Sequence, residues 1–111
     1  MSLHLFAGLR VRDFQVALPW YERLLGEPTF FPHATEAVWT IAEGRSLYVV
    51  EHAVGAGKCV VTVLLDDLDA EVAAIAARGL EPDEHETYSS GARKAIYRDP
   101  DGNEVGLGGA A

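Results

Sequence analysis

The chain of 111 residues contains a single cysteine, Cys59. No disulfide can therefore form within the chain, and a zinc site built from several cysteines is excluded. This composition suits a reducing compartment, and we expect the protein to be cytoplasmic.

Positive charge is also scarce. Nine Lys and Arg residues stand against seventeen Asp and Glu residues, which gives a net charge of -8. Such a balance repels phosphate backbones and anionic lipid. We therefore expect neither nucleic acid nor a membrane surface as a partner.

Long apolar runs are absent as well. The longest, Cys59 to Leu65, is interrupted by Thr62 and is far shorter than the ~20 residues that cross a bilayer. The N-terminal segment alternates in character and has no basic stretch before its apolar residues, so it indicates a strand rather than a signal peptide. With 49% hydrophobic and 23% charged residues, the composition is that of a folded globular domain.

The first half of the sequence predicts one strand, one helix and three further strands. Apolar residues alternate from Leu3 to Val11, which indicates a strand with its odd positions on a core. Asp13 suits the start of a helix and Gly26 its end, and Pro19 predicts a kink between them. The helical positions expected in the core are Ala17, Trp20, Tyr21, Leu24 and Leu25. Strands are predicted at residues 29–31, 37–42 and 46–52, with a turn at 43–45.

The same order recurs after the link AVGAGK at residues 53–58. Residues 58–65 predict a strand, and a helix follows at about 70–78, begun by Asp67 or Asp69 and ended by Gly79. Further strands are predicted near 80–86, 92–98 and 104–108. Each half is too small to bury its own sheet face. We therefore expect one domain over residues 1–111, with one module at about 1–53 and the other at about 58–109.

Three segments, taken in order, resemble the vicinal oxygen chelate superfamily of glyoxalase I, extradiol dioxygenases, fosfomycin-resistance enzymes and bleomycin-resistance proteins. VRDFQVALPWYERLLG is similar to the family's first strand-to-helix segment, DLDAEVAAIAARG to its second helix, and GARKAIYRDPDGNEVGL to its last hairpin. The resemblance implies an α+β fold of two βαβββ modules that form a curved mixed sheet. It also implies an open cup that a second subunit usually completes, so we expect a homodimer.

The resemblance places the family's metal ligands at three positions that have no donor atom here. These positions hold Phe6, Val60 and Gly106. Divalent transition metals need imidazole or carboxylate ligands, so we expect no metal and no other cofactor. His4 and Glu104 each lie two residues before such a position and would share its sheet face. A displaced metal site built on them is the alternative.

The predicted cup is lined by aromatic and small residues. Large rings beside glycines would leave a slot for a flat or largely apolar ligand. The candidate ligand-binding residues are Phe6, Gly8, Trp39, Tyr48, Val60, Thr62, Tyr97 and Gly106. For Trp39 and Tyr97, an equally good interpretation is a core that faces the helices.

No other catalytic pattern is present, because the sequence has no GxSxG and its GAGK lacks the full phosphate-loop pattern. We expect metal-independent binding of a small hydrophobic or aromatic molecule, as in bleomycin-resistance proteins that confer antibiotic resistance. The enzyme alternative is a glyoxalase-type lyase or isomerase, or a dioxygenase, acting through a displaced metal. A third possibility is a protein with a filled cup that works only by association.

Overall fold

The computed structural model describes residues 2–110 and has the predicted order of elements. The first module comprises β1 (Leu5–Val11), α1 (Phe14–Leu25), β2 (Phe30–His33), β3 (Glu36–Ala42) and β4 (Arg45–Glu51). After a short 3-10 helix, η1 (Ala53–Gly55), the second module comprises β5 (Val60–Leu64), α2 (Leu68–Ala77), β6 (Glu84–Thr87), β7 (Arg93–Arg98) and β8 (Glu104–Gly109). The sequence did not indicate η1. It also placed Arg45 in a turn, whereas Arg45 begins β4.

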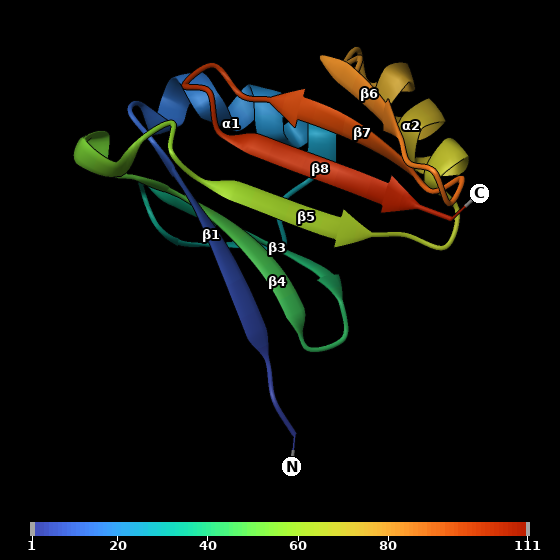
Figure 1. Cartoon of the computed structure of the whole chain (residues 1–111). Helices are drawn as coiled ribbons and strands as arrows, with labels where there is room; N and C mark the ends of the chain where they lie inside the picture. Colours follow the sequence, from blue (N-terminus) through green and yellow to red (C-terminus); the bar gives the residue numbers. More distant parts are fainter. Residues whose placement is uncertain (1, 111) are drawn as a thin grey trace.

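Each module forms its own four-stranded mixed sheet. The strand orders are β1-β4-β3-β2 and β5-β8-β7-β6. In both sheets the first strand pairs in parallel with the last, and the remaining pairs are antiparallel. The two sheets splay apart, with the helices on one side of them (Figure 1). The fold is thus the predicted α+β arrangement of two βαβββ modules.

Helix α1 begins and ends where the sequence predicts. The Asp13 side chain accepts hydrogen bonds from the backbone N–H groups of Gln15 and Val16, which have no partner within the helix. Gly26 ends the helix with a φ of 83°, a conformation that glycine adopts without strain. The helix continues through Pro19. Its buried residues are Phe14, Ala17, Trp20, Tyr21 and Leu24.

Helix α2 covers the second sheet in a similar way. It is capped by Asp67, whose side chain accepts from the N–H of Ala70, and it buries Leu68 and Ile75. The two helices contact each other, so the cores of the modules are continuous. No helix in residues 2–110 is long and apolar enough to cross a membrane.

Strand β1 is buried along only part of its length. Leu9 and Val11 are fully buried, whereas Leu3 and Leu5 are 67% and 62% exposed. The beginning of β1 extends beyond the helices toward the free N-terminal end (Figure 1). The prediction that all odd positions of this segment are buried is therefore wrong for its first residues, which lie outside the reach of the core.

The DPDGN turn before β8 has two buried polar residues, Asp99 and Asn103, at its ends. Asp99 is 5% exposed and accepts hydrogen bonds from the Tyr21 hydroxyl at 2.7 Å and from the backbone N–H groups of Asp101 and Asn103 at 2.9 Å. The Asn103 side-chain amide also donates to Asp99, at 2.7 Å. Burial, together with the charge and hydrogen bond of Asp99, raises the pKa of Tyr21 well above its usual value.

The same turn joins the two modules. The fully buried Asn103 side chain donates to the Arg10 carbonyl at 2.7 Å and accepts from the Cys59 N–H at 2.9 Å. Asp101 accepts from the Arg12 N–H at 2.9 Å. One turn thus provides hydrogen-bond partners for backbone groups at the end of β1 and just before β5. The tight turn predicted from DPDGN has a structural role that extends across the molecule.

Candidate ligand-binding site

The two sheets have open faces opposite their helix-facing sides, and most of the candidate residues lie there. Successive residues of a strand point to opposite faces, and Leu9 and Val11 of β1 point into the core. Phe6 and Gly8 therefore lie on the open face, and Gly8 pairs with Tyr48 across to β4. On the second sheet the corresponding residues are Val60, Thr62 and Gly106.

Two of the predicted aromatic residues lie on the other side. Trp39 is 2% exposed and Tyr97 is fully buried, and both belong to the core packed against the helices. Trp39 pairs with Leu47 of β4, and this register turns the Trp39 side chain toward the helices. The indole N–H of Trp39 donates to the Gly26 carbonyl at 2.9 Å. The expectation that these rings line the open cup is corrected: they pack in the core.

The open face of the first sheet presents an aromatic surface. Phe6 is 50% exposed, and the His4 ring stacks on it at a centroid distance of 4.6 Å and an interplanar angle of 16°. The His4 Nε2 lies 2.9 Å from the Ser46 hydroxyl, which fixes the imidazole over the strand. His4 thus extends the aromatic surface of Phe6. In the sequence, only the spacing of two residues between His4 and Phe6 pointed to this contact.

The space expected above the two glycines is filled by neighbouring side chains. A Cβ on Gly8 would lie 2.6 Å from the Tyr48 hydroxyl oxygen, so the Tyr48 ring rests on the backbone of β1. A Cβ on Gly106 would meet the side chain of Lys94, whose Nζ would lie 3.2 Å away. Each glycine therefore accommodates a side chain from the adjacent strand rather than an empty slot. Lys94 was not among the predicted site residues.

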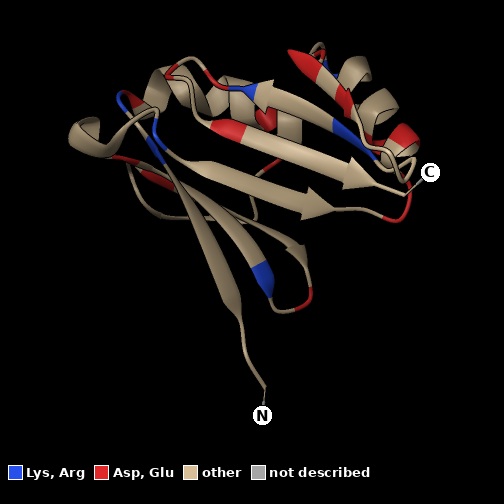
Figure 2. Ribbon diagram, viewed as in Figure 1, with Lys and Arg blue, Asp and Glu red and all other residues tan. Residues whose placement is uncertain are grey.

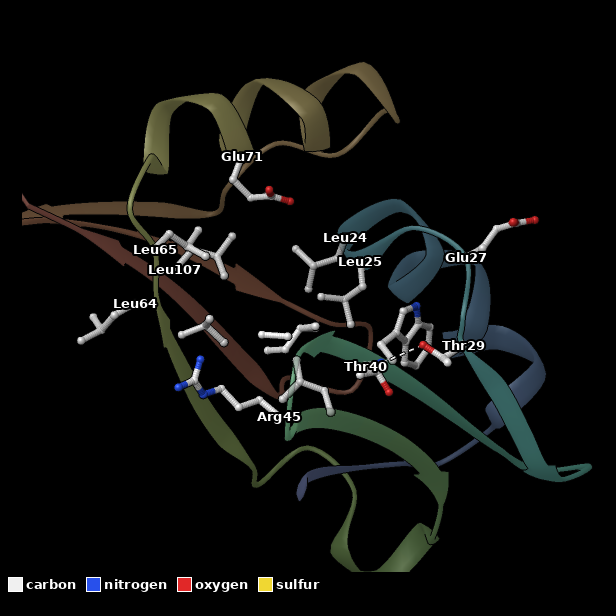
Figure 3. Close-up of a pocket in the computed structure, with 15 residues that line it drawn as sticks. Leu24, Leu25, Glu27, Thr29, Thr40, Arg45, Leu64, Leu65, Glu71 and Leu107 are labelled. Atoms are coloured by element: carbon white, nitrogen blue, oxygen red, sulfur yellow. Dashed lines mark hydrogen bonds between the residues drawn. The ribbon is translucent and has the colours of Figure 1, made fainter. Parts of the chain in front are cut away.

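Three cavities meet around Leu64, a residue of β5 that is 82% exposed. One, of about 400 Å³, lies between the modules, and Trp39 forms part of its wall. In it Glu71 points inward from α2, while Arg45 lies on the opposite side, on β4 (Figure 3). Neither Phe6 nor Val60 lines any of these three cavities.

The other two cavities lie beside β5. One, of about 300 Å³, follows the seam between β1 and β5 and includes Leu5, Ala7 and Thr62. The other, of about 360 Å³, lies at the end of the second sheet and includes Thr62, Tyr88 and Lys94. Thr62 is thus the candidate residue that borders two of the three cavities.

The chain matches the model of the Glyoxalase/Bleomycin resistance protein/Dioxygenase superfamily over residues 2–107. It belongs to this superfamily. No curated protein matches the sequence. Among solved structures, a glyoxalase/bleomycin resistance protein from Catenulispora acidiphila is 51% identical, with 99% of this chain and 100% of that chain covered and a TM-score of 0.95.

Solved structures of lower sequence identity share the fold. A bleomycin-binding protein, solved in complex with bleomycin, is 21% identical, with 99% and 100% of the two chains covered and a TM-score of 0.76. An antibiotic-binding protein, TnmS3, from a Streptomyces species is 24% identical, with 100% and 98% covered and a TM-score of 0.71. At this level of identity the likeness shows the fold alone.

The residues of this chain do not fit the metal site that the family resemblance implies. Phe6, Val60 and Gly106 offer no side-chain ligand atom. His4 contacts Ser46, and Glu104 forms an ion pair with Arg98 at 3.4 Å. His4 precedes β1 of the first sheet, whereas Glu104 begins β8 of the second sheet. Within residues 2–110, no group of three or more His, Cys, Asp or Glu residues is placed to hold a metal ion.

Proposed function

We propose that this protein binds a small hydrophobic or aromatic molecule, without a metal, in a cup that a second copy of the chain completes. The observation that carries the proposal is the open face itself. On it, Phe6 is half exposed and Val60 is two thirds exposed, at positions where the family resemblance places metal ligands. A surface of this kind favours stacking and apolar burial over coordination.

The superfamily relatives support this class of function. Two of the solved structures with this fold are named for binding bleomycin or an antibiotic. The open face here offers apolar side chains with a few polar tips, which is the usual composition of a small-molecule site. A role in drug sequestration, and hence in antibiotic resistance, is the specific form that we propose.

The test is a thermal-shift screen of planar aromatic molecules and glycopeptide antibiotics, followed by calorimetry on the wild type, Phe6→Ala and Phe31→Ala. Phe31 is a matched control because it is a comparably exposed phenylalanine on β2. We expect Phe6→Ala to weaken binding of a flat ligand by about 2- to 10-fold through loss of stacking. Phe31→Ala should leave affinity unchanged.

Metal content decides between binding and the enzyme alternative. Protein purified without a metal-affinity tag is expected to hold well under one divalent ion per chain, and added Zn, Ni, Mn or Fe should not raise the melting temperature. One tightly bound ion per chain, lost in His4→Ala or Glu104→Ala, would instead support a displaced metal site. Unchanged ligand affinity in folded Phe6→Ala would remove Phe6 from the site.

A further inference from the structure

Lys94 lies on the open face of the second sheet and has an unusual position there. It belongs to β7 and extends across β8 over Gly106, where a Cβ would meet its stem. Gly106 is buried although it lies on the open face, since the lysine covers it. The missing side chain at Gly106 is therefore what makes room for the ammonium group.

Lys94 has no anionic partner among residues 2–110, unlike the other cations of β7. Arg93 forms an ion pair with Asp69 at 2.8 Å, and Arg98 forms one with Glu84, also at 2.8 Å. Across the strands, Lys94 pairs in register with Glu86, but the Glu86 carboxylate accepts from the Tyr88 hydroxyl at 3.0 Å instead. The side chain of the half-buried Lys94 is thus turned away from the acidic strand β6 and toward Gly106 in the middle of the sheet.

The surroundings of Lys94 form a site of suitable size for a ring-sized molecule. A cavity of about 360 Å³ lies beside it, with Thr62, Leu64, Tyr88 and Gly108 among its walls. Tyr88 is 49% exposed and can present its ring, and Leu64 lies against Gly108. β5 carries no charged residue, while acidic residues gather on β6 and α2 (Figure 2). Arg93 also lines the cavity, but its guanidinium group is held by Asp69, so Lys94 is the cation there without an anionic partner among residues 2–110.

We propose that Lys94 determines ligand charge: it binds the carboxylate of a flat aromatic ligand whose ring lies in the cavity beside Tyr88 and Leu64. This assignment rests on the proposed binding function and goes beyond it, because it names the chemical class of the ligand and places the ring on the second sheet, in a cavity that Phe6 does not line. A charged hydrogen bond to lysine is strong when it is partly shielded from water. The net charge of -8 opposes an anion at long range, but salt screens that repulsion beyond about 10 Å, whereas Lys94 acts at contact distance.

The experiment compares two probes of the same shape that differ in charge, 2-naphthoate and 2-naphthamide. Their dissociation constants are measured by calorimetry on the wild type, Lys94→Met, Lys94→Arg and Lys58→Met. Lys58 is an exposed lysine in the link before β5, so its variant makes the same change of net charge elsewhere. We expect the wild type to bind naphthoate at least about 10-fold more tightly than naphthamide.

The variants distinguish the effect of the Lys94 charge on ligand affinity from the effect of the net charge of the protein. Lys94→Met should abolish the preference by weakening naphthoate binding much more than naphthamide binding. Lys94→Arg should retain most of the preference, and Lys58→Met should retain all of it. Equal affinity of the two probes for the wild type, or a preference that persists in Lys94→Met, would overturn this assignment and leave the binding function standing. If neither probe binds and the wider aromatic screen is also negative, both proposals fail. The wild-type comparison does not depend on how any variant folds.

Discussion

At the scale of single residues, two fully buried tyrosines differ in what their hydroxyl groups meet. The Tyr21 hydroxyl donates to Asp99, whereas the Tyr97 hydroxyl has no hydrogen-bond partner within residues 2–110. Burial, with smaller contributions from the charges of Glu81 and Glu71, raises the pKa of Tyr97 to about 12. Both rings fill the same core, so exchanging each for phenylalanine isolates the contribution of one hydroxyl group.

Tyr21→Phe is expected to lower the free energy of unfolding by about 1–3 kcal/mol, because it removes a donor from a buried carboxylate. Tyr97→Phe should change the free energy of unfolding by less than about 0.5 kcal/mol, or raise it slightly, because the lost hydroxyl has no hydrogen-bond partner within residues 2–110. Urea denaturation of the two variants beside the wild type measures both values. Equal destabilisation by the two substitutions would contradict the role assigned to Asp99.

At the scale of elements, the hairpin of β7 and β8 connects the second sheet to the first through hydrogen bonds of its turn. Its turn carries Asn103, whose side chain bonds to the end of β1 and to the residue before β5. The short link between the modules supplies only η1, and no strand of one sheet pairs with a strand of the other. The relative placement of the two open faces therefore depends on this buried turn, together with the packing of the helices.

Asn103→Ala is expected to reduce the free energy of unfolding by about 3 kcal/mol, because it removes the side-chain hydrogen bonds to the Cys59 N–H, the Arg10 carbonyl and the buried Asp99 carboxylate. Hydrogen exchange should also quicken for β1 and β5, which the turn connects. Ser89→Ala, at an exposed position between β6 and β7, serves as a control and should change neither quantity. A loss below 1 kcal/mol would show that helix packing alone holds the modules together.

At the scale of the whole molecule, β1 and β5 are each one of the two edge strands of their sheet, and exposed apolar side chains border them. β1 pairs only with β4, and β5 pairs only with β8. Leu5 is 62% exposed and Val60 is 67% exposed along these edges. An open edge with an apolar border favours association with a second chain, and closed symmetric dimers are the commonest result.

We predict a homodimer, which light scattering at micromolar concentration would detect as twice the 12.0 kDa mass of the chain. Leu5→Glu should weaken it at least about 10-fold, because a carboxylate would be buried without a partner. Val16→Glu is the control, since Val16 is 60% exposed on α1, away from both strand edges. A monomeric wild type would contradict the prediction and leave each open face without a cover.

The order of elements and the caps of both helices followed from the sequence, because these depend on neighbours within a few residues. Asp13 and Asp67 accept hydrogen bonds from N–H groups two or three positions ahead. Gly26 and Gly79 have positive φ just after the helices, where glycine adopts that conformation without strain. The motifs that carry the family resemblance are equally local. Superfamily membership could thus be predicted before any coordinates were known.

Tertiary structure alone decided which side chains meet on the open faces. Pairing with β4 sets the phase of β3 and buries Trp39, and the register of β7 with β8 places Lys94 over Gly106. The sequence shows that Gly106 has no side-chain atom that could bind a metal, but it does not show that Lys94, on another strand, covers Gly106. The partner of Asn103 in β1 is ninety-three positions away along the chain. Contacts over such separations arise only when the modules fold against each other, so local patterns carry no trace of them.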